Sequence, residues 1–452
     1  MGTIYNFSSN ALLKRIGLSP GKKPLVFFIS AVLITLPLGY AYNSIVLILF
    51  VLYSLLSAKK GNVHISKMLL LPMFLYGFMV LSLLWSIDIE STLKALSKEA
   101  ALLFVPLAFF FNRRFIRMGR CAILKNFSRG MVLAGIVVLA RALIRYILTG
   151  NTDVFFYHEL ATRDINAIYL SALFSVPLFW FLTVKSKSFW NYAGFIFLFG
   201  LIFLLASKTV IIVDVLITGI YLLFYTRMQK RAKITMFVLF MASAIILGYY
   251  GKVGERLVAE FTTKSKTENG VNILTVKEAW ETQRFTHNDY FNGSAFRIYQ
   301  IRIFTELLTE EPIVFTGYGL NASPKKVYEK GIEHNVSPDD GTGYGYGVQN
   351  FHNQYVETFA DLGIFGFLLL LLILGANLKK AFKTKDFIHI AFAILMIALL
   401  LTESFLWRQR GIVFFTMLYC LFNGLLPKGF DKERHEKNTN NGSSRLPGVT
   451  PL

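Results

Sequence analysis

The sequence predicts an all-α polytopic membrane protein, and three observations carry this prediction. Of the 452 residues, 54% are hydrophobic and only 16% are charged, whereas about a quarter of residues are charged in a soluble domain. Apolar runs of about 18 to 22 residues recur along the chain, and each could cross about 30 Å of hydrocarbon as a helix. The runs are continuous and do not alternate, which excludes the short strands of a membrane β-barrel.

The apolar runs and the basic clusters between them predict about twelve transmembrane helices. The chain then divides into a cytoplasmic N-terminus at 1–23, helices 1–9 at 24–250, a large loop at 251–359 between spans 9 and 10, helices 10–12 at 360–427, and a disordered cytoplasmic tail at 428–452. The expected spans are 24–40, 41–58, 68–85, 94–111, 127–148, 166–184, 190–206, 209–226, 234–250, 360–378, 387–405 and 411–426.

The basic clusters fall on one side of the membrane when the spans alternate. That side is cytoplasmic by the positive-inside rule, so both termini are inside and the large loop is periplasmic. The net charge of +20 is therefore topogenic and does not indicate a nucleic-acid partner. No cleavage signature follows the basic N-terminus, which predicts a retained anchor. Cys121 and Cys420 are the only cysteines, so a disulfide framework is excluded.

The 251–359 loop is the one place where a soluble subdomain could form. Apolar residues at helical spacing predict a helix over 295–309, ended by Glu311-Pro312. A glycine-rich stretch follows at 341–347. No strand precedes it and no Lys-Ser/Thr pair follows it, so we interpret it as a mobile loop or lid and not as a nucleotide cradle.

An excess of cations is expected on the non-cytoplasmic side, where basic residues are normally scarce. Snorkelling toward the interface would explain any one of them. Their convergence at the mouth of a helical bundle instead suggests an anion site, because Arg forks and Lys charges suit phosphate oxygens. The residues are Lys94, Lys98, Arg141, Arg145, Arg163, Lys208, Arg297, Arg302, Arg408 and Arg410.

The seven histidines are dispersed, and no pair has the i, i+4 spacing of a metal site on a helix, so we expect no metal and no cofactor. His352 differs in its context, because it stands where the long loop re-enters the membrane. A histidine in a loop is usually a surface residue, but this one is placed to meet a substrate embedded in the membrane.

Two blocks of sequence resemble the O-antigen ligase and polymerase superfamily. The first is HNQYVETFADLGIFG at 352–366 followed by a Leu-rich span, which is similar to the superfamily's His-Asn, acidic residue, Gly-Ile-x-Gly signature. The second is GSAFRI at 293–298 followed by EPIVFTGYG at 311–319. It resembles an Arg-containing helix that leads to a P-x-x-G-x-G turn, although four residues here separate the Pro from the first Gly.

The resemblance implies a metal-independent glycosyltransferase of GT-C-type architecture in the bacterial inner membrane. Its members take a glycan from undecaprenyl diphosphate and pass it to lipid A-core or to another lipid-linked unit. The resemblance places His352 and Arg297 at the active site. Ligases carry a Ser-Arg pair before a membrane helix where this chain has Ser207-Lys208, so Lys208, with Arg163 and Lys98, is expected to bind the donor diphosphate.

We therefore expect an O-antigen ligase whose site faces the periplasm, with His352 as the general base and Arg297 stabilising the leaving group. Glu357 or a backbone carbonyl would orient the histidine. An O-antigen or capsule polymerase of the same superfamily is the first alternative. A transporter of lipid-linked sugars is the second, although its ionisable residues would more often lie on broken helices at the midplane.

Overall fold

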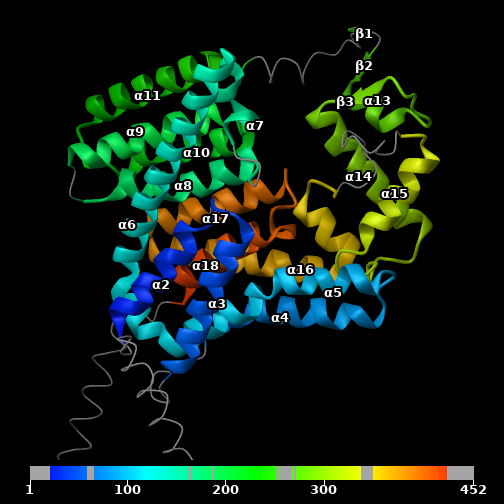
Figure 1. Cartoon of the computed structure of the whole chain (residues 1–452), viewed down its shortest axis with the longest axis horizontal. Coiled ribbons are helices and arrows are strands. Elements are labelled where there is room, and N and C mark those ends of the chain that lie inside the picture. The colour runs from blue at the N-terminus through cyan, green and yellow to red at the C-terminus, as the bar shows by residue number, and fades with distance from the viewer. Residues whose placement is uncertain are drawn as a thin grey trace, which may run out of the picture.

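The structure is a computed structural model that describes residues 21–58, 66–161, 165–185, 188–250, 254, 267–268, 271–336 and 350–424. These residues are mostly helical, as the sequence predicts. They form a large helical bundle and a smaller lobe beside it (Figure 1). The predictions for residues 1–20, for the glycine-rich stretch at 341–347 and for the tail at 428–452 lie outside the described residues.

The bundle contains the long apolar helices of the chain. Its N-terminal part comprises α2 (Lys22–Ile34), α3 (Tyr40–Leu56), α4 (Lys67–Leu81), α5 (Ile89–Glu99), α6 (Ala101–Thr149), the one-turn α7 (Tyr157–Leu160), α8 (Ala167–Thr183), α9 (Phe189–Leu204), α10 (Lys208–Ile220) and α11 (Lys230–Tyr250). Its C-terminal part comprises α16 (Gln354–Thr384), α17 (Phe387–Leu400) and α18 (Gln409–Asn423).

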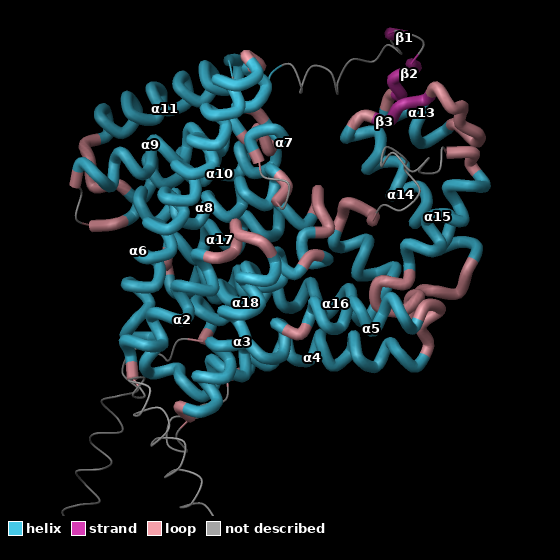
Figure 2. Tube along the Cα trace, viewed as in Figure 1, coloured by secondary structure: helices cyan, strands magenta, loops and turns pink. Residues whose placement is uncertain are grey.

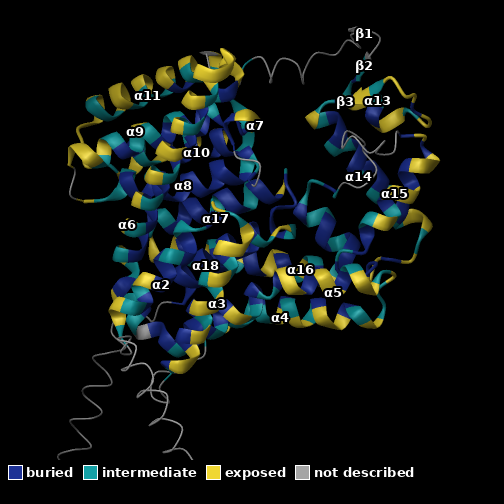
Figure 3. Cartoon of the chain, viewed as in Figure 1, coloured by how far each residue is buried: buried dark blue, intermediate teal, exposed yellow. Residues whose placement is uncertain are grey.

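Five helical segments of the described chain are long and apolar enough to cross a membrane, and four shorter apolar helices accompany them. The chain is therefore a multi-pass membrane protein, while the count of twelve spans stays a prediction. Figure 3 shows exposed residues along α11 and many buried residues on α8 and α17, which pack against each other. Apolar residues exposed on the outer helices face lipid, because a hydrocarbon solvent does not penalise them.

One part of the predicted topology is wrong. The basic loop expected between the spans at 94–111 and 127–148 is absent, because α5 is followed by the single 49-residue helix α6, which contains all of 127–148 and most of 94–111. Arginines inside α6 hold it against the C-terminal helices: Arg120 pairs with Asp386 at the start of α17, and Arg113 donates to the carbonyl of Gly424. The basic cluster is thus part of a continuous helix.

The smaller lobe contains all the strands of the described chain (Figure 2). Strand β2 (Val271–Leu274) pairs antiparallel with β1 (Thr267–Glu268) and parallel with β3 (Asp289–Phe291). The helices are α13 (Val276–Glu281), α14 (Gly293–Glu310) and α15 (Ser323–Glu333). They enclose a second apolar core around Phe285, Phe291 and Tyr299. A core of its own lets this lobe present side chains rigidly to the bundle.

Helix α14 confirms the helix predicted at 295–309. The Asn292 side chain caps it by accepting from the backbone N–H groups of Ser294 and Ala295, and the helix ends before Glu311. The turn after α14, which contains Tyr318 and Gly319, packs against a kink in α16. Glycine at position 363 has φ 64° and ψ −168°, and the carbonyls of Ala360 and Asp361, just before it, accept from the N–H groups of Tyr318 and Gly319 at 2.9 and 2.8 Å.

Candidate functional site

A cavity of about 450 Å³ opens between the bundle and the smaller lobe. Its walls are the N-terminal ends of α8 and α10, the first turn of α14, the turn before α16, and the segment after α17. Three residues predicted for the site, Lys208, Arg297 and His352, line this one cavity. They are far apart in the sequence, and the docking of the lobe on α16 brings them together.

Arg297 is held in one orientation by three hydrogen bonds. Its Nε donates to the carbonyl of Thr402 at 2.8 Å, and Nη1 donates to the carbonyl of Gly293 at 2.9 Å. Nη2 forms an ion pair with Glu403 Oε1 at 2.9 Å. Because the Arg297 side chain is 31% exposed and lines the cavity, it keeps a surface toward a ligand while its direction is fixed.

Glu403 lies between the two central residues. Its Oε1 meets Arg297, and its Oε2 lies 3.5 Å from His352 Nδ1. Burial raises the pKa of this carboxyl, but the contacts with His352 and Arg297 outweigh burial and hold the pKa below its ordinary value. Glu403 therefore stays ionised although its side chain is only 8% exposed.

His352 occupies a strained turn immediately before α16. Its φ is 48°, in the left-handed region, and its N–H donates to Asn350 Oδ1. Asn353 then caps α16 by accepting from the N–H groups of Tyr355 and Val356. The imidazole packs edge-on against the ring of Phe296, with centroids 5.6 Å apart. A strained backbone at a polar cavity residue is typical of functional sites.

Glu357 does not contact the imidazole, so the expectation that it orients His352 is wrong. Its Oε2 instead accepts from the Phe351 N–H and from the Ser404 hydroxyl, each at 2.9 Å. Phe351 precedes His352 and Ser404 follows Glu403. Glu357 thus holds together the two segments that carry the facing side chains.

Lys208 is the first residue of α10, and Ser207 stands at its N-cap position. The next residue, Thr209, shares a hydrogen bond of 3.0 Å with Thr402, which also accepts from Arg297. A helix N-terminus carries partial positive charge, so a lysine there adds to a positive field. Together with the backbone N–H groups at the start of α10, this arrangement favours an anion in the cavity.

The other predicted cations that the structure describes do not line this cavity. Lys98 lines a separate cavity of about 260 Å³, where its Nζ lies 5.4 Å from the centre of the Trp407 ring. Arg163 lies outside the described residues. Arg141 and Arg145 donate to carbonyls of the α7 segment, and Arg410 donates to the Leu38 carbonyl. Among the described members of the set, Lys208 and Arg297 converge on this cavity.

The three predicted residues of the cavity fall within one stretch, 193–371, that matches the O-antigen ligase family. This stretch is therefore similar to the domain of O-antigen ligases. No curated protein matches the chain closely enough to count as a relative. The family indicates a ligase or polymerase activity of the glycosyltransferase type, with a lipid-linked glycan and an acceptor as substrates.

Glu403 lies beyond the matched stretch of the O-antigen ligase domain, and the sequence analysis missed it. A carboxylate at the end of an apolar run was a usable signal, because ionisable groups at membrane depth are costly unless paired. The residues predicted for that face were all cations. His158, one of the dispersed histidines, also lines the cavity. Among the described residues, no group of three His, Cys, Asp or Glu side chains could hold a metal ion.

Proposed function

We propose that this protein is an O-antigen ligase that transfers a glycan from undecaprenyl diphosphate to a sugar hydroxyl of lipid A-core. The reaction takes place at the periplasmic face of the inner membrane and needs no metal. The observation that carries the proposal is the linked set Arg297, Glu403 and His352 beside Lys208 in one cavity. A fixed cation and a carboxylate-bound imidazole are what the two halves of a glycosyl transfer require.

The donor half depends on charge. When the glycosidic bond breaks, the electron pair goes to the diphosphate oxygen, and negative charge grows on the leaving group. Arg297 and Lys208 stabilise that charge, and the N-terminus of α10 adds its positive field. Because Glu403 fixes the guanidinium beforehand, little reorganisation is needed during the reaction.

The acceptor half depends on a base. The carboxylate of Glu403 beside Nδ1 favours the tautomer with its proton on that nitrogen, so Nε2 carries the lone pair. Nε2 takes the proton of the acceptor hydroxyl as that oxygen attacks the anomeric carbon. Direct in-line attack inverts the anomeric centre. The Glu403 carboxylate then stabilises the imidazolium that forms.

A gel of lipopolysaccharide from a deletion strain tests the ligase assignment. If the protein is a ligase, all glycan-capped species disappear, and expression of the wild-type protein restores them. A polymerase of the same family would use the same chemistry on a different acceptor. Its deletion would leave core plus one repeat unit, and that ladder would replace our assignment. Loss of the ladder together with accumulation of the lipid-linked glycan on the cytoplasmic face would indicate a transporter, whereas loss of a ligase leaves that glycan on the periplasmic face.

The first residue-level prediction separates the roles of His352 and Arg297. His352→Ala should lower transfer by about 100- to 10,000-fold while donor binding stays near normal, because a general base acts in the chemical step. Arg297→Ala should weaken both, and Arg297→Lys should recover only part, since a point charge replaces a two-pronged donor. Transfer and undecaprenyl diphosphate binding are measured on purified protein in excess EDTA.

Two exposed residues of the same lobe supply matched controls. His287→Ala and Arg284→Ala remove the same side chains at positions outside the cavity, and both should leave transfer unchanged. A folded His352→Ala protein with normal turnover would refute the base assignment. Complete loss of wild-type activity in EDTA, restored by a divalent ion, would refute the metal-independent mechanism.

A further inference from the structure

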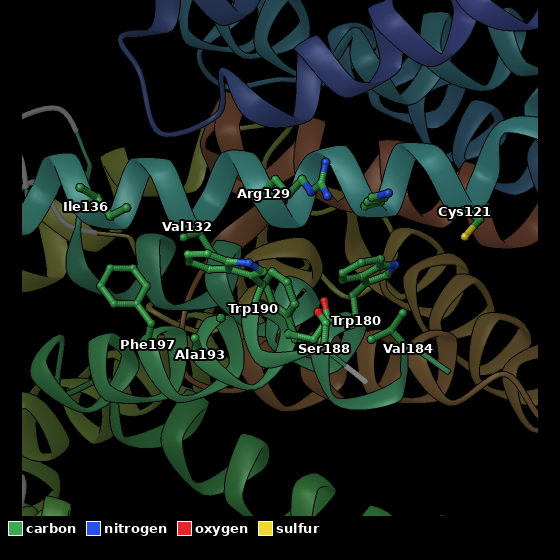
Figure 4. A pocket seen from close by; sticks show the side chains of 14 residues that line it. Cys121, Arg129, Val132, Ile136, Trp180, Val184, Ser188, Trp190, Ala193 and Phe197 are labelled. Carbon is green, nitrogen blue, oxygen red and sulfur yellow. The ribbon is translucent and has the colours of Figure 1, made fainter. Parts of the chain in front are cut away.

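A second, larger cavity of about 790 Å³ lies between α6 and the hairpin formed by α8 and α9. Figure 4 shows this groove, with Arg129 on α6, Ser188 on the opposite wall, and Ile136 and Phe197 at one end. It shares no lining residue with the candidate active site. None of its fourteen lining side chains is acidic.

One face of α6 forms the first wall. Cys121, Lys125, Arg129, Val132 and Ile136 recur at spacings of four and three residues, so they lie in one stripe along the helix. The stripe is about 22 Å long at 1.5 Å per residue. Its first half is cationic and its second half is apolar, and neither cation forms an ion pair with a described carboxylate.

The hairpin forms the opposite wall with the same change of polarity. Ser188 and Asn191 are the polar residues of this wall, and the amphipathic rings of Trp180 and Trp190 also line the groove. Phe197 continues the apolar end. Tryptophan is enriched where membrane meets water, since its ring is apolar and its N–H is polar. Both walls thus carry polar side chains that suit a lipid headgroup and apolar side chains that suit acyl chains.

The groove lies at the other end of α8 from the candidate active site. Asn166 and Ile168, at the start of α8, line the active-site cavity, whereas Trp180 and Val184, at its end, line the groove. The helix has 17 residues, which separates the two cavities by about 25 Å. The groove therefore belongs to the opposite leaflet. Trp190 is 78% and Ile136 50% exposed, so its walls face the bilayer.

We propose that this groove binds an anionic diacyl phospholipid, with the phosphate between Lys125 and Arg129 and the acyl chains along Val132, Ile136 and Phe197. Basic pockets between membrane helices recognise anionic headgroups in this way. Free phosphate would leave the apolar half empty. Because the walls face the bilayer, phospholipid, the bulk component of the leaflet, can enter the groove directly. The single negative charge of its phosphodiester suits Lys125 and Arg129, which have no acidic side chain beside them in the groove.

The native Cys121 provides a local reporter for this lipid. It is exposed at the polar end of the stripe, whereas Cys420, the only other cysteine, is fully buried. We expect phosphatidylglycerol, added to the purified full-length protein in detergent, to slow maleimide alkylation of Cys121. Phosphatidylcholine with the same acyl chains should do so only weakly. Intact mass gives the rate of alkylation.

The combined change Lys125→Gln and Arg129→Gln should raise the phosphatidylglycerol concentration needed for protection about tenfold or more. The pair Lys230→Gln and Arg231→Gln removes the same charge from exposed residues outside the groove, and it should leave protection unchanged. Ala193→Trp fills the groove without changing its charge, and it should also abolish protection. If the Ala193→Trp protein does not fold, as judged by its melting temperature, Val132→Phe is used in its place.

Several outcomes would overturn the proposal. Equal protection by phosphatidylcholine would remove the role of the anionic headgroup. Equal loss in the Lys230/Arg231 control would mean that general surface charge attracts the lipid. Protection that survives Ala193→Trp or Val132→Phe would place the lipid elsewhere. Protection by undecaprenyl phosphate at a lower concentration than phosphatidylglycerol would replace the diacyl occupant with a polyprenyl one.

Discussion

The carboxylate of Glu403 links Arg297 and His352, which are 55 positions apart in the sequence. Arg297 and His352 each contact one of its oxygens, so a shift of either side chain changes the environment of the other. The sequence predicted both residues from their motifs. It could not predict their shared partner, because Glu403 reaches them only through the packing of the α17–α18 connection against the lobe.

Glu403→Gln should lower transfer by about 100-fold or more. The amide keeps the shape of the side chain but removes the charge that orients Arg297 and stabilises an imidazolium at His352. Transfer kinetics on the purified variant check this. Glu281→Gln, at an exposed position of the lobe, is the matched control and should stay active. Near-normal turnover of Glu403→Gln would contradict the linked arrangement.

The same variant carries a prediction about pH. The folded-state pKa of Glu403 lies below its ordinary value of 4.5, so its ionised form stabilises the folded protein above that value. The stabilisation should be lost as pH falls through the lowered pKa. We expect the difference in melting temperature between wild type and Glu403→Gln to be constant at neutral pH and to shrink below pH 4.5. A difference that grows toward acid pH would contradict this sign.

At the scale of elements, the kink in α16 explains why two glycine-containing blocks of the sequence occur together. The kink frees the carbonyls of Ala360 and Asp361, and the turn at Tyr318 and Gly319 satisfies them. The Asp361 side chain adds a bond to the Ser323 hydroxyl at 2.6 Å. The sequence indicated both blocks by resemblance. It did not indicate that the turn at Tyr318 and Gly319 packs against the kink in α16. Backbone hydrogen bonds between residues so far apart in the sequence leave no periodic pattern in it.

Gly363→Ala should disrupt this docking and reduce both stability and transfer. Glycine adopts the backbone conformation of residue 363 readily, whereas another residue would adopt it at a cost of about 1 to 3 kcal/mol. An added Cβ would also collide with the Phe315 carbonyl. Gly375→Ala, in the same helix with open space around it, is the control and should be neutral or slightly stabilising. Melting temperature and transfer are compared for the two variants, and equal behaviour would contradict the docking role.

At the scale of the whole molecule, hydropathy predicted most apolar helices to within a few residues, because a membrane helix must satisfy its own backbone bonds. It failed at α6. The arginines at 113–120 suggested an aqueous loop, but in the structure Arg113 and Arg120 bond to the ends of α18 and α17. Charge in the sequence does not distinguish a side chain that reaches water from one that ties helices together.

The predicted sidedness can be tested directly. In a Cys121→Ser background, a cysteine at the exposed Ile332 of the lobe should react with an impermeant thiol reagent in intact spheroplasts. A cysteine at the exposed Lys185, between α8 and α9, should react only after lysis. The positive-inside rule gives this orientation. The reverse pattern would invert the protein and remove the periplasmic site.

The continuity of α6 has a rotational consequence. Each residue of a helix turns the next by about 100°, so the first turns of α6 set the angle at which its later residues face the α8–α9 hairpin. One residue inserted after Arg120 would swing the face from Lys125 to Ile136 about 100° away from that hairpin, whereas a flexible loop would absorb the insertion. Four residues would nearly restore the angle but advance the face by about 6 Å. The rotation of α6 about its axis at one end of the bundle therefore determines which of its residues face the hairpin at the other end.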